Sequence, residues 1–227
     1  RDSSTSRGLG DVYKRQRQNL FGHSVSREEA VRYFSLDPSK KTILILGGSL
    51  GARTINRTLT AGLDIIQQNP DIQFIWQTGK IYIDQVRDAI TTAVGEAVHH
   101  PHINAIPNLY VTDFIKDMAN AYAAADLVIS RAGAGSISEF CLLHKPVILV
   151  PSPNVAEDHQ TKNALALVDK DAAIYVKDVE AQEKLLPVAL ATVKDSGKLK
   201  ELSNNIAKLA LPDSATIIAK EVLKLIK

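Results

Sequence analysis

The alternation of short β-branched runs with longer helical stretches constrains the fold of this chain more than any other feature. Runs typical of buried strands occur at residues 42–46, 72–77, 109–111, 127–130, 147–150 and 173–176. Helical patterns separate them at residues 52–68, 82–94, 117–124, 136–143 and 158–168. Strands alternating with helices of this length form βαβ units, whose right-handed crossovers produce a parallel sheet. The sequence therefore predicts an α/β fold with a Rossmann-like, doubly wound parallel sheet.

The two ends of the chain differ from this central pattern. Three further helical patterns, at residues 180–194, 198–208 and 214–226, are expected to wrap the sheet or to reach another domain. Residues 1–16 are polar, rich in Gly and Ser and without periodicity, so we expect them to be disordered. They also resemble the adapter-derived translations sometimes fused to truncated reading frames. We therefore expect the natural sequence to enter at about Arg17, with its own N-terminal portion missing.

The net charge narrows the class of partner, and the cysteine content indicates the compartment. With 27 basic and 25 acidic residues among 227, the chain has a formal charge of only +2 and no Lys/Arg block, which argues against a nucleic-acid partner. The single cysteine, Cys141, rules out an intramolecular disulfide and any CxxC motif. It is typical of a cytoplasmic protein. The longest apolar runs are far shorter than the roughly 20 residues that cross a bilayer.

The turn after the first predicted strand, Gly47-Gly48-Ser49-Leu50-Gly51-Ala52-Arg53, has the composition of a phosphate-binding loop. Glycines let backbone N–H groups approach an anion, and the following helix contributes a partial positive charge. The loop matches neither the GxGxxG pattern nor a P-loop. A tight turn that needs glycine only for packing is an equally good interpretation of the loop alone.

A second small-residue loop, Ser130-Arg131-Ala132-Gly133-Ala134-Gly135-Ser136, opens another predicted helix and is followed by Glu139. Ser136-x-x-Glu139 is the pattern of a capping box, in which the glutamate satisfies a backbone N–H group. For the isolated segment this interpretation is favoured. A carboxylate at this place in a nucleotide fold could instead accept the hydroxyls of a ribose.

Other polar segments are less informative by themselves. Residues 151–164 form a polar cluster at a helix start, which suits a hydroxyl-rich ligand or ordinary N-capping by Asn154 or Asp158. Phe114 and Ile115 follow a strand, where they could hold a nucleobase or simply staple the next helix. The histidines of residues 99–102 have no carboxylate or cysteine at ligand spacing, so a solvated loop is favoured over a metal site.

Five segments occur together and in order: GGSLGAR (47–53), WQTGK (76–80), FIKDM (114–118), SRAGAGSISE (130–139) and EDHQTKNAL (157–165). This set resembles the C-terminal, donor-binding domain of the MurG family, the N-acetylglucosaminyltransferases of peptidoglycan synthesis, which have the GT-B fold. The resemblance covers residues 17–227, and the combination is specific although each segment alone is not. It implies that the chain is one half of a GT-B glycosyltransferase, a domain that binds UDP-GlcNAc.

The resemblance also implies roles for particular residues. The diphosphate would be held by Ser49 and by the backbone of Ala134, Gly135, Ser136, Ile137 and Ser138. Glu139 corresponds to the ribose-binding glutamate, Ile115 to the isoleucine that contacts uracil, and Gln160 to a sugar-binding glutamine. Arg131 corresponds to the arginine of the second loop, and Arg17 to the arginine that ends the family's GNPVR segment. A neighbouring glutamine of some members is His159 here.

The implied reaction transfers GlcNAc from UDP-GlcNAc to the muramoyl 4-hydroxyl of lipid I, with inversion and without a cofactor or metal. Two helix N-termini and Ser49 can stabilise the charge that develops on the departing diphosphate. The family's N-terminal domain, which binds the lipid acceptor and carries a histidine associated with catalysis, has no counterpart in this sequence. We therefore expect no catalytic base here, little or no turnover by the chain alone, and work at the inner face of the cytoplasmic membrane.

Three other functions remain open at this point. The chain could be the donor-binding subunit of a two-chain glycosyltransferase, because some relatives place the two domains in separate proteins. It could be an isomerase similar to UDP-GlcNAc 2-epimerases, which share the GT-B scaffold. It could also be a noncatalytic nucleotide-sensing module. The order of the five segments favours the transferase.

Overall fold

A computed structural model describes residues 25–48, 50–95, 105–153 and 159–210. Its centre is a parallel six-stranded sheet with the strand order β3-β2-β1-β4-β5-β6. The strands are β1 (Lys41–Leu46), β2 (Ile72–Gln77), β3 (Leu109–Thr112), β4 (Leu127–Ser130), β5 (Val147–Leu149) and β6 (Ile174–Tyr175). This is the order of a doubly wound Rossmann-like sheet, whose direction of winding reverses between β1 and β4. The predicted fold class is confirmed.

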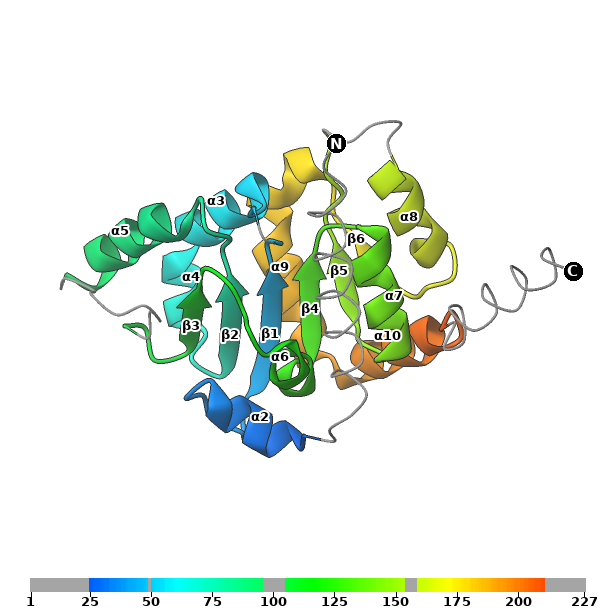
Figure 1. Cartoon of the computed structure of the whole chain (residues 1–227), viewed down its shortest axis with the longest axis horizontal. Helices are drawn as coiled ribbons and strands as arrows, with labels where there is room; N and C mark the ends of the chain where they lie inside the picture. The colour runs from blue at the N-terminus through cyan, green and yellow to red at the C-terminus, as the bar shows by residue number, and fades with distance from the viewer. Residues whose placement is uncertain (1–24, 49, 96–104, 154–158, 211–227) are drawn as a thin grey trace, which may run out of the picture.

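Helices cover both faces of the sheet (Figure 1). One face carries α3 (Arg53–Ala61), α4 (Leu63–Gln68), α5 (Ile83–Val94) and α9 (Ala181–Lys194), and the other carries α2 (Arg27–Tyr33), α6 (Met118–Ala124), α7 (Ala134–Leu142) and α8 (His159–Val168). The helix α10 (Ser196–Ala207) follows α9, and a 3-10 turn, η2 (Asp178–Glu180), precedes it. Because α10 contributes one buried residue to each core, it closes the end of the sheet rather than one face.

The strand sequences explain the two cores. In β1, Ile43 and Ile45 belong to one hydrophobic cluster, while Leu44 and Leu46 belong to the other. Successive strand residues point to opposite faces, so a continuous apolar run is the pattern of a strand covered on both sides. The strand β2 is likewise buried along its whole length, with Trp76 fully enclosed.

The structure divides one predicted helix and adds one that the sequence analysis missed. The single helix expected at residues 52–68 is divided at Gly62, where α3 ends and α4 begins. The helix α9 crosses closely at this point, since a Cβ atom on Gly62 would lie 2.2 Å from Leu186 Cδ1. The helix α2 was not expected at all, although Ser26 and Glu29 form a complete capping box at its start. The helix predicted at residues 214–226 lies outside the described residues.

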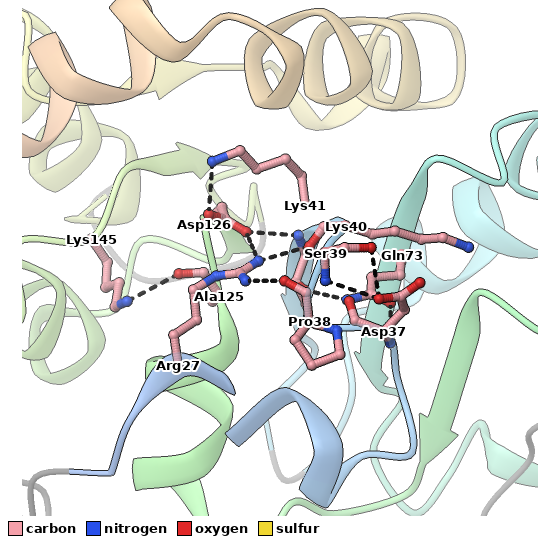
Figure 2. Close-up of polar contacts among 11 residues, drawn as sticks. Arg27, Asp37, Pro38, Ser39, Lys40, Lys41, Gln73, Ala125, Asp126 and Lys145 are labelled. Atoms are coloured by element: carbon pink, nitrogen blue, oxygen red, sulfur yellow. Dashed lines mark hydrogen bonds and ion pairs between the residues drawn. The ribbon is translucent and has the colours of Figure 1, made fainter. Parts of the chain in front are cut away.

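A polar cluster at the amino ends of the strands fixes α2 to the sheet (Figure 2). Asp126, just before β4, accepts hydrogen bonds from Arg27 at 2.7 Å, from Lys41 at 3.1 Å and from the Thr42 backbone N–H at 2.8 Å. Lys145 donates to the Ala125 carbonyl at 3.0 Å, and burial lowers the pKa of its amine. The cluster stabilises the edge opposite the carboxyl ends of the strands, which leaves that other edge to the loops described below.

Across the described ranges, none of the helices combines the length and the apolar character that a membrane crossing requires.

Candidate functional site

The carboxyl ends of β1 and β4 open into a pocket of about 210 Å³. In Figure 1 these strand ends lie along the upper edge of the sheet. The first pocket is lined by Leu46, Gly47, Gly48, Gln77, Phe114, Ile115, Met118, Tyr122, Ser130, Arg131, Ser136 and Glu139. It therefore stands at the switch point of the sheet, where connections leave in opposite directions and a crevice for a ligand remains.

The glycine loop after β1 is held against the turn that follows β2. Gly47 donates its N–H group to the Gln77 carbonyl at 3.0 Å, and a Cβ atom on Gly51 would lie 2.5 Å from the Thr78 carbonyl oxygen. A buried chain of side-chain hydrogen bonds fixes that oxygen, because Trp76 donates to Asn56 at 2.9 Å and Asn56 donates to Thr78 O at 2.8 Å. The loop thus has both a close backbone contact and the left-handed conformation of a pocket-lining turn, with φ of +71° at Gly48 and +86° at Gly51.

The helix α7 begins earlier than the sequence predicts, and this excludes the capping box. Its N-cap is Gly133, which offers no side chain, so Ser136 is the third helical residue and not the cap. The first intrahelical bond joins Ile137 N to Gly133 O at 3.0 Å. The N–H groups of Ala134, Gly135 and Ser136 therefore precede the hydrogen-bonded ladder and are free of intrahelical acceptors. A helix start without a side-chain cap is suited to an anion.

Glu139 lies one turn into α7 and lines the first pocket. Its Oε2 atom accepts a hydrogen bond of 2.8 Å from the hydroxyl of Tyr122, a buried residue of α6. The carboxylate is thus oriented from a neighbouring helix rather than turned back onto the start of its own helix. Of the two interpretations left open above, this placement is consistent with a pocket carboxylate and inconsistent with a cap.

Ile115 is placed by both core packing and a backbone hydrogen bond. Its side chain belongs to the hydrophobic core, and its N–H group donates to Gln77 Oε1 at 3.1 Å. Phe114, which is 37% exposed, provides an apolar wall of the same pocket. The two residues thus contribute to the core and to the pocket at the same time, so the structural and ligand-binding interpretations are compatible.

Arg131 follows β4 and connects the β4–α7 turn to the segment after β5 and to η2 through its side chain. Its Nη1 atom donates to the carbonyls of Val150 at 3.0 Å and Pro151 at 3.2 Å, and it also contacts Asp178 Oδ1. Asp178 Oδ2 accepts a hydrogen bond of 2.8 Å from Thr54 in the first turn of α3. Arg131 lines the first pocket and also a second one.

The second pocket, of about 390 Å³, continues from Arg131 between the starts of α3 and α8. It is lined by Gly51, Ala52, Arg53, Thr54, Tyr82, Arg131, Ser152, Pro153, Gln160 and Asp178. Gln160 Oε1 accepts hydrogen bonds from the backbone N–H groups of Ser152 at 2.9 Å and Ala132 at 3.3 Å. Gln160 therefore joins the β4–α7 turn to the β5–α8 turn, and its amide nitrogen has no hydrogen-bond partner among the described residues.

The structure brings together five of the eleven residues to which the resemblance assigns a role. Ile115, Arg131, Ser136, Glu139 and Gln160 line one pocket or the other. Gly135, Ala134, Ile137 and Ser138 lie in the first turns of α7, outside the lining, and the N–H group of Ile137 is already engaged in the helix. Arg17, Ser49, Asn154, Asp158 and the histidines of residues 99–102 lie outside the described residues.

Three residues of the site escaped the sequence analysis. Gln77, Tyr122 and Asp178 each hold another site residue in place, through Ile115, Glu139 and Arg131 respectively. Gln77 could have been singled out from the sequence, because a glutamine at the end of a strand that is buried on both faces is an unusual buried polar residue. Tyr122 and Asp178 carry no local signal, since their partners are distant in the sequence.

An open parallel sheet with a crevice at its switch point defines a Rossmann-like class of α/β domain. More specifically, the model of the glycosyltransferase family 28 C-terminal domain matches residues 42–218, and the chain belongs to this family. It is 72% identical over 209 residues, or 92% of its length, to a protein of Bacteroides fragilis named UDP-N-acetylglucosamine--N-acetylmuramyl-(pentapeptide) pyrophosphoryl-undecaprenol N-acetylglucosamine transferase. The match covers 52% of that relative, so the chain spans about half the length of the curated relatives it matches.

Solved structures agree with this assignment. The crystal structure of Acinetobacter baumannii MurG superposes with a TM-score of 0.68 at 27% identity, covering 90% of this chain and 54% of that one. The UDP-GlcNAc 2-epimerase of Neisseria meningitidis, bound to UDP-GlcNAc, has a TM-score of 0.63 over 94% of this chain and 53% of its own. Its identity of 14% indicates a shared fold alone.

Proposed function

We propose that this chain is the donor-binding half of an inverting N-acetylglucosaminyltransferase that converts lipid I to lipid II in peptidoglycan synthesis. The observation that carries the proposal is that the glycine loop, Ser136 in the uncapped first turn of α7 and the carboxylate of Glu139 line one pocket. These groups suit a diphosphate joined to a ribose. The name of the 72% identical relative indicates the particular donor and acceptor.

The donor UDP-GlcNAc is expected to span both pockets. The uracil would lie against Phe114 and Ile115, and the ribose hydroxyls would donate to Glu139. The diphosphate would then meet the N–H groups at the start of α7, and the resemblance adds Ser49, which lies outside the described residues. Beyond Arg131, the sugar would enter the second pocket, where the amide nitrogen of Gln160, which has no hydrogen-bond partner within the described ranges, could donate to a hydroxyl or carbonyl oxygen.

Departure of UDP builds negative charge on the diphosphate, and fixed N–H dipoles can stabilise that charge without reorganisation. We assign no general base to this chain. An inverting displacement needs one within about 3 Å of the acceptor hydroxyl, and we place it in the half of the relatives that this chain does not match. The same half would bind lipid I and keep the enzyme peripheral on the inner face of the cytoplasmic membrane.

Calorimetric titration tests the donor-binding part of this proposal. The purified chain is expected to bind UDP-GlcNAc and UDP, and the Glu139→Gln variant is expected to bind both more weakly. The variant keeps the size of the side chain and removes its charge, so it serves as a matched control for the carboxylate. No heat from the wild-type chain at millimolar ligand would contradict the proposal.

A chimera tests the reaction. Joining the N-terminal half of the Bacteroides fragilis relative to residues 17–227 is expected to give transfer of GlcNAc to lipid I, with neither half active alone. Epimerisation of UDP-GlcNAc without acceptor would instead identify an isomerase. Co-purification of a separate membrane-anchored chain would favour a two-chain transferase. Binding without any activity in the chimera would indicate a nucleotide sensor.

A further inference from the structure

The Arg131–Asp178 pair connects four segments that are far apart in the sequence. Arg131 comes from the β4–α7 turn, its carbonyl acceptors from the end of β5, and Asp178 from η2 after β6. Through Asp178 Oδ2 and Thr54, the pair also reaches the first turn of α3, just beyond the glycine loop. One side-chain cluster therefore fixes the relative positions of the loops that surround both pockets.

The pair is shielded from solvent and yet borders the ligand space. The side chains of Arg131 and Asp178 are 19% and 15% exposed. Arg131 lines both pockets, so it stands at the junction where a ligand that spans them must pass. Only its Nη1 atom makes hydrogen bonds within the described part of the chain, which leaves the Nε and Nη2 donors for a ligand.

The carbonyls of Val150 and Pro151 alone would hold Arg131 less firmly than they do together with the Asp178 carboxylate. The arginine side chain has several rotatable bonds, and ordering it costs conformational entropy. The carboxylate of Asp178 supplies the charge-assisted contact that keeps one edge of the guanidinium on the protein. Thr54 in turn orients that carboxylate, because its hydroxyl hydrogen-bonds the second oxygen at 2.8 Å.

We propose that Asp178 is a positioning residue that holds Arg131 at the junction of the two pockets, where its free N–H edge binds the diphosphate of a nucleotide sugar. The inference rests on the proposed function and adds a residue to it. Asp178 acts on the diphosphate through Arg131. Because Asp178 also lines the second pocket, where the sugar is expected, UDP isolates this role better than UDP-GlcNAc does.

Substitution of Asp178 by Ala and by Asn separates position from charge. The Asp178→Ala variant releases Arg131, and its affinity for UDP and UDP-GlcNAc is expected to fall about tenfold, the effect of losing one well-placed charged hydrogen bond. The Asp178→Asn variant keeps an acceptor for Arg131, and the Thr54 hydroxyl can accept from the new amide. Its affinity is expected to stay within about threefold of the wild type.

Isothermal titrations with UDP, UDP-GlcNAc and uridine provide the measurement, because a general structural defect would weaken uridine as well. The expected result is unchanged uridine binding in both variants. In the Arg131→Ala background, the Asp178→Ala substitution is expected to have no further effect on UDP affinity. Where Asp178→Ala does not fold, Thr54→Val removes the hydroxyl that orients the same carboxylate. Its affinity for UDP is expected to fall about threefold, and its affinity for uridine is expected to stay unchanged.

Several results would overturn the inference while leaving the proposed function standing. These are unchanged or tighter UDP binding by Asp178→Ala, an equal loss of UDP and uridine, or additive losses in the double variant. A loss in Asp178→Asn as large as that in Asp178→Ala would also contradict it, because charge rather than position would then matter. Absence of UDP binding by the wild-type chain would remove both the proposed function and this inference.

Discussion

The glycine loop after β1 allows a matched comparison between two substitutions. Gly48 and Gly51 both have positive φ values, of +71° and +86°. A Cβ atom on Gly48 would meet nothing within 4 Å, whereas one on Gly51 would lie 2.5 Å from the Thr78 carbonyl oxygen and 2.4 Å from the Tyr82 ring. Both changes to Ala carry the left-handed strain, of about 1–2 kcal/mol. Only Gly51→Ala adds a steric conflict.

The size of the conflict follows from what surrounds it. The Tyr82 ring can turn aside, but the Thr78 oxygen is fixed by the 2.8 Å hydrogen bond from the buried Asn56 side chain. Overpacking of this kind costs about 1–3 kcal/mol. The expected destabilisation is therefore about 1 kcal/mol for Gly48→Ala, after part of the strain is offset by the smaller entropy of the unfolded chain, and about 2–4 kcal/mol for Gly51→Ala.

Thermal unfolding followed by circular dichroism measures the difference. A chain of this size loses about 2–4 °C in Tm per kcal/mol, so Gly51→Ala is expected to lower Tm at least twice as far as Gly48→Ala. Adding Tyr82→Ala to Gly51→Ala removes the ring but not the carbonyl oxygen, and we expect only partial recovery. Equal Tm values for the two glycine variants, or complete recovery in the double variant, would refute the reasoning.

Three further predictions concern single side chains. Asp126→Ala is expected to lower the free energy of unfolding by about 2 kcal/mol, because it leaves the buried Thr42 N–H group without its acceptor and removes a counter-charge; urea denaturation measures this, and Asp126→Asn should lose less. Lys145→Met is expected to flatten the pH dependence of stability in alkaline solution. Burial holds the Lys145 pKa below its ordinary value of 10.5, so between the lowered pKa and 10.5 the unfolded chain binds more protons and the wild type gains stability as pH rises. Tyr122→Phe is expected to weaken UDP binding about threefold in calorimetry, since it removes the hydroxyl that orients Glu139.

Each of these three has its own contrary outcome. A loss of stability in the Asp126→Asn variant larger than in Asp126→Ala would contradict the role of the backbone acceptor. Parallel stability curves for the wild type and Lys145→Met between pH 7 and 10 would show that the buried amine is not responsible. Undiminished UDP affinity in Tyr122→Phe would mean that Glu139 needs no support from α6.

Much of the fold was predictable because its strands are covered on both faces. The bounds of β2 and β4 agree with the predicted runs, since burial on both sides favours mainly apolar residues, which give way to polar and glycine residues at the loops. Helix starts were less predictable. The same Ser-x-x-Glu pattern is a true capping box at Ser26 and Glu29, but at Ser136 and Glu139 it lies inside a helix that begins at Ala134. The local pattern is identical, and the packing of each helix decides between the two.

The sequence likewise predicts some residues of the candidate site and misses others. The position of the loops was predictable, because they follow buried strands and precede helices, and Glu139, Ile115 and Gln160 follow from the resemblance in order and spacing. The supporting residues were not. Tyr122 acts on Glu139 across 17 positions, and Asp178 acts on Arg131 across 47.

By itself, the sequence determined the α/β class, the parallel sheet and the loops that carry the polar groups, because each depends on periodicity or on neighbours along the chain. Tertiary structure alone decided which way Glu139 is turned, where α3 ends at Gly62, and that Arg131 is clasped by Asp178 at the junction of two pockets. These features depend on side chains brought together from distant segments. A hydrogen bond or a steric contact of that kind exists only once the whole sheet has formed, so nothing in the local sequence records it.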